Sequence, residues 1–466
     1  MARAPSVPHG DGRAMGIQAI GLEPDAGRQH DLLRILGAVF GIALGIGSMV
    51  GAGILRTPGA VAAAVPSPWW IVALWIFGGV HALLGVNVVA ELFSADPRAG
   101  GLYVPVRRAF GDFAGLVVGW SDVLANAASA AALAIVGVEF LAFAWPGVAR
   151  VALALASAII AALVAINALG IREGRAAQIV ATGLKTALLA VIIAGAIFMP
   201  SGPTPLENPR ISSPVIGAAA LFAAYQLVYG AYSGWYGPVY FAEEDVAPAR
   251  NIPRVLLGVV ASVMLLYLGV NFALLRGISV AELGKSDIPV RILIDRMFGP
   301  FGAIILALTG FVLVVGCLNS ALLIAPRTMY ALGRDRLLPR ICTQVGAGGT
   351  PQAALLLFGA AGIAMVATGS FDAAFRVMGA LGGIALLAVD LSLFRLRGRE
   401  PGLKRPFQAW FYPVLPLAAL LIDSLLLCGI VWYDPTSGWI TLATVAAILP
   451  VWWLMTRARA IATDLV

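Results

Sequence analysis

The stretch GIGSMVGAGIL, residues 45–55, lies inside the first long apolar segment and carries four glycines between Gly45 and Gly53. A helix in a bilayer must satisfy its own backbone hydrogen bonds, because lipid offers no partners. Glycine weakens a helix, so its use here needs a reason. The pattern GSMVG indicates either close packing between membrane helices or a helix interrupted to form a binding site.

The composition around this stretch excludes a soluble protein. Of the 466 residues, 60% are hydrophobic and 12% are charged, and the mean hydropathy is +0.91, whereas soluble domains are about 25% charged. The basic residues lie between apolar segments and form no cluster with aromatic residues, so no nucleic-acid partner is expected. The three cysteines have no paired or metal-binding spacing, so neither a disulfide nor a metal site is predicted.

The apolar pattern predicts an all-α polytopic membrane protein, because about 20 apolar residues cross a bilayer as a helix. A disordered cytoplasmic tail (1–31) is expected to precede one transmembrane domain (32–456) and a short cytoplasmic C-terminus (457–466). The twelve predicted membrane helices are 35–64, 69–93, 112–145, 149–169, 177–199, 214–242, 253–275, 301–324, 353–369, 371–394, 411–433 and 437–456.

The distribution of Arg and Lys predicts the orientation. With the N-terminus in the cytoplasm, 22 of the 31 basic residues fall in cytoplasmic segments, 7 in outer loops and 2 within spans. Cytoplasmic loops of membrane proteins are enriched in basic residues. Both termini are therefore expected in the cytoplasm, with the protein in the plasma (inner) membrane.

The first and sixth ranges are unusually long and share an interruption. The sixth carries YGAYSGWYGP, residues 229–238. The sixth range comes five spans after the first, and because five is odd the two cross the membrane in opposite directions, as in transporters built from inverted repeats. A half-helix that begins near Gly51 points N–H groups at the gap, which suits a carboxylate. Carbonyls at the end of the preceding half-helix suit an ammonium group, so an α-amino acid fits the interruption.

Five stretches resemble motifs of the amino acid–polyamine–organocation (APC) transporter superfamily, most closely the L-type amino acid transporters and their bacterial relatives. They are GSMVGAGILRTPG (47–59), AELFSADPRAGGLYVPVRRAFG (90–111), QIVATGLKTALLAVII (178–193), GAYSGWYGPVYFAEEDVAPARNIPR (230–254) and APRTMYALGRDRLLP (325–339). The resemblance implies two inverted five-helix repeats (35–199 and 214–394) and two further helices (411–456).

The resemblance also implies the residues that bind substrate. Backbone N–H groups of Gly51, Ala52 and Gly53 would hold the carboxylate. The carbonyls expected to hold the amine belong to Met49, Gly230, Ala231 and Ser233, and the side chains expected to set specificity are Met49, Tyr232, Trp235 and Tyr236, together with the third helix.

One position departs from the family pattern. L-type relatives usually carry an aromatic gate where this chain has Gly230. Either Tyr229 or Tyr232 replaces that gate, or the substrate is bulkier than a small neutral amino acid.

Lys185 is the most informative single charge. It lies about eight residues inside the fifth range, roughly 12 Å deep at 1.5 Å per residue, and an intramembrane lysine is a functional candidate unless it snorkels. The resemblance implies that it replaces a coupling sodium ion between the first helix, near Gly47 and Ser48, and the eighth, near Asn319 and Ser320. It would either carry a proton during transport or stay charged as a brace in an exchanger.

Other charges carry weaker indications. Glu243 and Glu244 are interpreted as an inner gate whose partners are Arg107, Arg108 or Arg334. His81 is interpreted as a packed residue and Asp423 as a contact between protomers.

The predicted function is secondary active transport of amino acids by alternating access, sodium-independent and either proton-linked or exchange. The sequence shows no catalytic cluster, phosphate-binding loop or charged pore ring, which disfavours an enzyme, an ATP-driven pump and a channel. No cofactor or obligatory protein partner is expected. The alternative is a polyamine, organic-cation or organic-acid transporter, but neither interruption carries a carboxylate to bind a polyamine.

Overall fold

A computed structural model describes residues 32–199, 216–367, 371–433 and 435–464, so the predicted tail 1–31 lies outside it. These described residues form helices and no β-strand, which agrees with the predicted all-α class. Seven of the helices are long and apolar enough to cross a membrane, and an eighth span results if one bent pair counts as one. The number of twelve spans and the inverted repeats remain predictions.

Each predicted range nevertheless contains helix. The helices are α1 (Ala38–Met49) with α2 (Gly53–Ala64), α3 (Pro68–Ala95), α5 (Asp112–Ala144), α6 (Ala152–Leu169), α7 (Ile171–Phe198), α8 (Ala218–Tyr232), α9 (Pro248–Gly277), α12 (Gly302–Arg334), α13 (Gln352–Ala367), α14 (Phe371–Arg399), α15 (Val414–Tyr433) and α16 (Pro435–Asp464). Shorter helices join them: α4 (Tyr103–Phe110), η1 (Pro146–Val151), η3 (Gly237–Phe241), α10 (Val280–Leu283), α11 (Pro289–Phe298), η4 (Gly299–Phe301) and η5 (Arg340–Thr343).

Two helices continue well beyond the predicted spans. The eighth range ends at 324, whereas α12 continues to Arg334, and Arg327 in this extension is buried and paired with a carboxylate. The twelfth range ends at 456, whereas α16 continues to Asp464.

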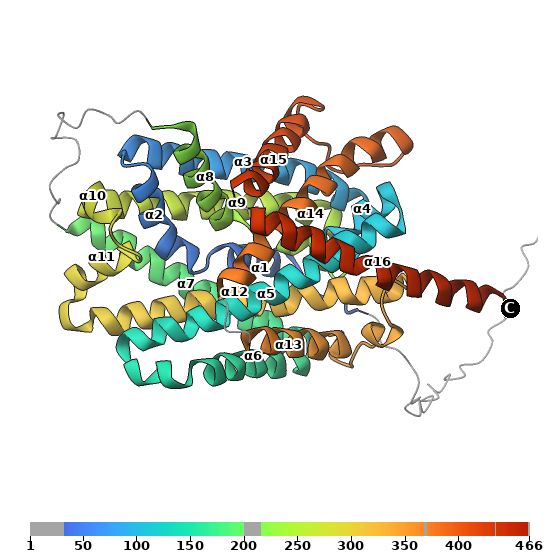
Figure 1. Ribbon diagram of the computed structural model, residues 1–466, viewed down its shortest axis with the longest axis horizontal. Helices are drawn as coiled ribbons and strands as arrows, with labels where there is room; N and C mark the ends of the chain where they lie inside the picture. Colours follow the sequence, from blue (N-terminus) through green and yellow to red (C-terminus); the bar gives the residue numbers. More distant parts are fainter. Residues whose placement is uncertain (1–31, 200–215, 368–370, 434, 465–466) are drawn as a thin grey trace, which may run out of the picture.

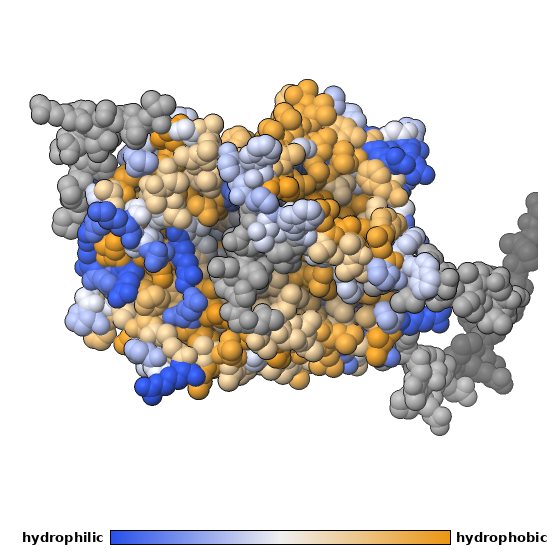
Figure 2. All heavy atoms as spheres, in the orientation of Figure 1, coloured by the Kyte–Doolittle hydropathy of each residue, from blue (hydrophilic) through white to orange (hydrophobic). Residues whose placement is uncertain are grey.

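The outer surface is that of a multi-pass membrane protein. Most long helices run along the long axis of the molecule, with α6 and α13 together at one edge and α3 and α15 together at the other (Figure 1). Strongly hydrophilic residues gather toward the two ends of this axis, on either side of a largely hydrophobic middle (Figure 2). Large apolar side chains such as Trp69, Leu169 and Phe198 are more than two-thirds exposed, which suits contact with lipid.

The interruption of the first helix is confirmed. Helix α1 ends at Met49, Val50 has an extended backbone, and α2 begins at Gly53 after a bend of 43°. Helix α1 is placed centrally, since it packs against α7, α9 and α12.

The sixth range is interrupted as well. Helix α8 ends at Tyr232, Ser233 is extended, Gly234 has a φ of +97°, and the chain resumes as η3 at Gly237. A positive φ strains any residue with a Cβ atom, so Gly234 permits this turn.

Candidate substrate and cation site

The two interruptions touch each other in the middle of the bundle. A Cβ atom on Gly234 would lie 3.1 Å from the carbonyl oxygen of Ser48, a tight contact, so a glycine favours this close approach. A Cβ atom on Gly53 would meet Ala231 at 3.8 Å. The segments predicted to bind one substrate, residues 48–53 and 230–236, are therefore neighbours in space although about 180 residues separate them in the sequence.

Unpaired backbone donors lie at the start of α2. Within the described part of the chain, the N–H groups of Gly51, Ala52 and Gly53 have no backbone acceptor, and no side chain caps this helix. The first N–H groups of a helix lack intrahelical partners and carry the positive end of its dipole. This geometry fits the predicted carboxylate site.

The carbonyls at the ends of α1 and α8 meet at one hydroxyl group. The hydroxyl oxygen of Tyr267, on α9, lies 2.9 Å from the carbonyl oxygens of both Met49 and Ala231. A phenol has one proton, so it donates to one of these carbonyls at a time. The other carbonyl keeps its capacity to accept from an amine. The third predicted carbonyl, that of Gly230, accepts from the Ser233 N–H at 3.2 Å.

Removing the Tyr267 hydroxyl should loosen the junction between the interruptions. Tyr267→Phe leaves both buried carbonyls without this donor, which we expect to cost about 1–3 kcal/mol of folding free energy. The unfolding midpoint of the purified protein would report the loss. Tyr433→Phe, at an exposed ring, is the control, and equal midpoints for the two variants would contradict the bridging role.

Lys185 reaches the first interruption, as predicted. Its side chain is fully buried on α7. The Nζ atom donates to the carbonyl oxygens of Gly47 and Val50, at 2.7 Å each, and lies 3.8 Å from the sulfur of Cys317 on α12. Carbonyl oxygens stabilise a buried ammonium group by accepting hydrogen bonds from its N–H groups. The lysine therefore links α7 to the unwound end of α1 and to α12.

The expected partners of Lys185 on α12 lie elsewhere. Asn319 hydrogen-bonds Asn167 of α6 at 2.7 Å and Gln178 of α7 at 2.8 Å. Ser320 donates to its own helix at Gly316, as Ser48 does to Leu44. The contact with Lys185 is instead made by Cys317, which lies two and three residues before those expected partners on the same helix.

The predicted specificity side chains turn mostly toward α3. Tyr232 donates to the carbonyl of Trp75 at 3.0 Å. Trp235 packs over Gly85, and its ring meets that of Tyr236 edge to face. Met49 is buried.

Open space surrounds Gly230, the position at which L-type relatives carry an aromatic gate. A Cβ atom on Gly230 would meet nothing within 4 Å. Tyr229 stacks on His81 of α3, with ring centroids 5.7 Å apart. Both tyrosines proposed as replacements, Tyr229 and Tyr232, are thus engaged with α3 rather than with this space.

The expected inner gate consists of two ion pairs of different burial. Glu243 pairs with Arg334 at 2.9 Å at a partly exposed position. Glu244 pairs with Arg327, which the sequence did not suggest; the distances are 2.8 and 3.1 Å and both side chains are buried. The Arg327 guanidinium also lies 4.0 Å from the ring centre of Phe241.

The other two arginines expected at this gate have different partners. Arg107 pairs with Asp112 and Asp335, and Arg108 with Asp96 and Glu400. Tyr103, on the same short helix α4, hydrogen-bonds Asp335. Burial and this neighbouring carboxylate raise the pKa of Tyr103 above its ordinary value.

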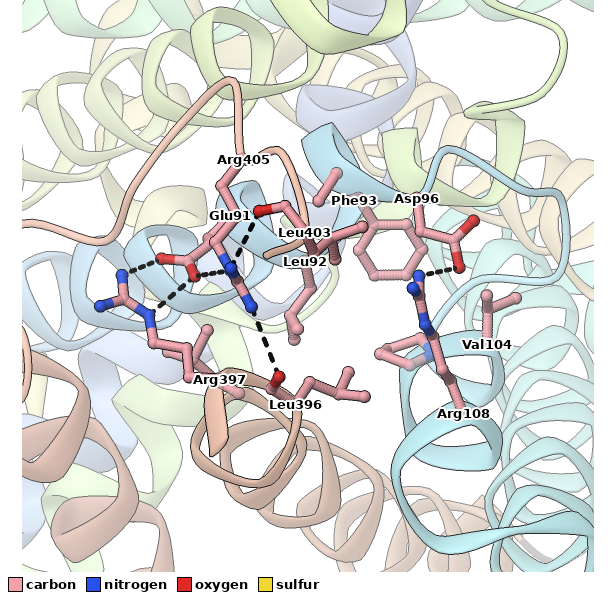
Figure 3. A pocket seen from close by; sticks show the side chains of 13 residues that line it. Glu91, Leu92, Phe93, Asp96, Val104, Arg108, Leu396, Arg397, Leu403 and Arg405 are labelled. Carbon is pink, nitrogen blue, oxygen red and sulfur yellow. Dashed lines mark hydrogen bonds and ion pairs between the residues drawn. The ribbon is translucent and has the colours of Figure 1, made fainter. Parts of the chain in front are cut away.

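A second cluster ties the loop after α14 to α3. Glu91 is buried between Arg397 and Arg405 (Figure 3), at 2.5 and 3.1 Å, and accepts from the Ala409 N–H at 2.6 Å. Asn87, one turn earlier on α3, exchanges hydrogen bonds with the backbone of Trp410. These paired charges and hydrogen bonds hold the loop after α14 against α3.

The sequence analysis missed one buried polar cluster beside the second interruption. It joins His81 of α3, Asp390 of α14 and Asp423 of α15. Each residue is an ionisable group within an apolar stretch of its helix, and 342 residues separate the first from the last. An ionisable residue within a membrane helix was the available signal, but the pairing itself depends on the fold.

Comparison with known proteins shows the family to which the chain belongs. A family model of amino acid permeases matches residues 36–455, nearly the whole chain. The chain belongs to the amino acid permease family. This confirms the predicted APC resemblance, and a permease is a transporter rather than an enzyme.

The matches to curated relatives cover most of this permease and most of each relative. The serine/threonine exchanger SteT of Bacillus subtilis is 27% identical over 92% of this chain and 99% of its own. The b(0,+)-type amino acid transporter 1 of Mus musculus is 25% identical over 87% and 84%. The human cystine/glutamate transporter is 24% identical over 93% and 87%. All three are amino acid transporters by name. Each match covers 87% or more of this permease.

Proposed function

We propose that this permease is a sodium-independent secondary active transporter of amino acids in the plasma (inner) membrane, with both termini cytoplasmic. It works by alternating access, through exchange or proton linkage. The free N–H groups of residues 51–53 hold the substrate carboxylate. The carbonyls of Met49 and Ala231, which now share one hydroxyl, hold its amine.

The observation that carries this proposal is the position of the Lys185 ammonium group. In sodium-coupled transporters of the fold that the chain resembles, a cation bridges the first and eighth helices. Here the Nζ atom donates to Gly47 and Val50 of the first helix and contacts Cys317 of α12. An ammonium group in this place removes the need for a bound sodium ion.

The relatives support amino acids as the substrate class, because the exchanger and both other transporters are named for amino acids. The alternative, a polyamine, organic cation or organic acid, is tested in the same assay. The assay is uptake of labelled amino acids into proteoliposomes, with and without internal amino acid, and with and without a pH gradient. Saturable uptake in sodium-free buffer is expected. Saturable uptake of a diamine alone would overturn the assignment.

The open space at Gly230 predicts how the substrate range is set. Gly230→Phe fits without a clash at its Cβ atom, so the protein should fold, while the ring fills the space above the interruption. We expect at least tenfold weaker competition by leucine or phenylalanine, about 1.4 kcal/mol, and a smaller change for alanine or serine. Gly258→Phe, on α9 with open space around its Cβ atom, is the matched control. Equal losses for small and large amino acids would contradict this interpretation.

A further inference from the structure

A titratable cluster lies beside the second interruption and plays no part in the substrate contacts described above. The Nδ1 atom of His81 lies 2.7 Å from the hydroxyl oxygen of Tyr225, and its Nε2 atom lies 3.3 Å from Oδ1 of Asp423. The carboxyl groups of Asp423 and Asp390 line the same pocket. His81, Asp390 and Asp423 are 5%, 3% and 7% exposed.

Two oxygen atoms of this cluster lack a hydrogen bond. Within the described residues, Oδ2 of Asp390 has no hydrogen-bond partner, and Oδ1 of Asp423 has the ion-pair contact with Nε2 of His81 at 3.3 Å but no hydrogen bond. Both side chains line a cavity of about 20 Å³ together with His81, Ser233 and Trp235. Such a volume holds about one water molecule. The cavity therefore has room for a water or a proton, but not for an amino acid or a diamine.

The charges in the cluster require a proton. Two carboxylates that share a buried site cannot both ionise without a large penalty, and an uncompensated charge at this depth is costly. One proton between Asp390 and Asp423 removes the repulsion, and His81 provides a place for a second. A histidine ordinarily changes charge near neutral pH. Among the described residues, no three His, Cys, Asp or Glu side chains are arranged to hold a metal ion.

The surrounding helices bring few competing charges. The other titratable side chains facing the cluster, Tyr225 and Tyr229, come from α8. Helix α16 packs against α15, and residues 435–456 contain no titratable side chain. The buried carboxylate of α5, Asp122, is occupied by Tyr240 and Thr328. The number of protons bound there therefore depends on the three residues of the cluster themselves.

We propose that His81, Asp390 and Asp423 form a proton-binding site whose occupancy controls the second helix interruption and hence the rate of transport. Tyr225 hydrogen-bonds His81 and Tyr229 stacks on it, and both lie in the last two turns of α8, which end at that interruption. Adding a proton to His81 reverses the direction of its hydrogen bond with Tyr225, because both ring nitrogens then donate and the Tyr225 hydroxyl must accept. This inference rests on the proposed amino acid transport and names its proton site.

The test compares amino acid exchange at equal internal and external pH for the wild type, Asp390→Asn, Asp423→Asn and Ser424→Ala. We expect the wild-type rate to change about tenfold between about pH 5 and pH 8, as the proposed site gains or loses its proton. The two asparagine variants, which mimic a protonated carboxyl, should change less than about twofold over this range. Ser424 bonds only its own helix, so Ser424→Ala should keep the wild-type profile. A wild-type profile in both asparagine variants overturns the proposal.

A second measurement is independent of transport. Infrared difference spectra of the purified protein between the same two pH values should show a protonated carboxyl band that disappears in Asp390→Asn and Asp423→Asn. If an asparagine variant does not fold, the wild-type spectrum and His81→Gln still decide. A band present in the wild type, without uptake of any amino acid, would reject the proposed function and keep the proton site. Absence of the band, or activation by sodium that the variants lose, overturns the proton site alone.

Discussion

Lys185→Ala is expected to reduce amino acid exchange at least tenfold. The variant removes the ammonium group and leaves the carbonyls of Gly47 and Val50 without their donor. Each unsatisfied buried acceptor costs about 1–3 kcal/mol, and about 1.4 kcal/mol is a factor of ten. The loss falls on the interruption of the first helix, where we propose that the substrate binds.

The measurement is the initial rate of exchange in proteoliposomes with matched protein content. Thr186→Val is the control, because Thr186 is the next residue and its hydroxyl bonds only to Thr182 of its own helix. Thr186→Val should transport at nearly the wild-type rate. A normal rate for Lys185→Ala would show that the ammonium group is not needed, and a rate that depends on sodium in the wild type would contradict its assigned role.

Glu244→Gln is expected to destabilise the protein more than any substitution at the neighbouring exposed pair. Arg327 would keep a buried charge without its carboxylate. Breaking a buried ion pair by removing one partner costs about 3–5 kcal/mol. The unfolding midpoint in detergent should fall by several degrees, and Arg327→Met in the same chain should recover part of the loss, because it removes the orphaned charge.

Glu243→Gln provides the comparison. Its pair with Arg334 is about one-third exposed on both sides, and pairs of this kind contribute about 0.2–1 kcal/mol. A midpoint for Glu244→Gln as close to the wild type as that of Glu243→Gln would show that the buried pair does not hold α12 to the segment after η3.

The features of the fold that local chemistry determines were predictable from the sequence. The length of the apolar segments predicted where the helices lie, and the glycines predicted both interruptions. Lipid offers no hydrogen-bond partners, so a membrane helix is interrupted only where its free backbone groups line a cavity or bind a ligand. Helix ends were less predictable. Helix α12 continues beyond the predicted span, and Arg327 in that extension pairs with Glu244, 83 residues away.

The site was predictable in proportion to how local its contacts are. The contact of Lys185 with the first helix was predicted, but its neighbour on α12 is Cys317 rather than Asn319 or Ser320, because the rotation of a helix decides which face meets its partner. The cluster of His81, Asp390 and Asp423 was not predicted, because three helices far apart in sequence form it. Tyr267 was missed for the same reason.

The most direct test of the central account is competition by altered substrates. An amino acid that is transported should be compared with its amide, which lacks the carboxylate, and with its deaminated acid, which lacks the amine. If residues 51–53 hold the carboxylate and the carbonyls of Met49 and Ala231 hold the amine, each analogue should compete for labelled uptake at least tenfold more weakly, about 1.4 kcal/mol. Competition as strong as that of the parent amino acid, by either analogue, would contradict the account.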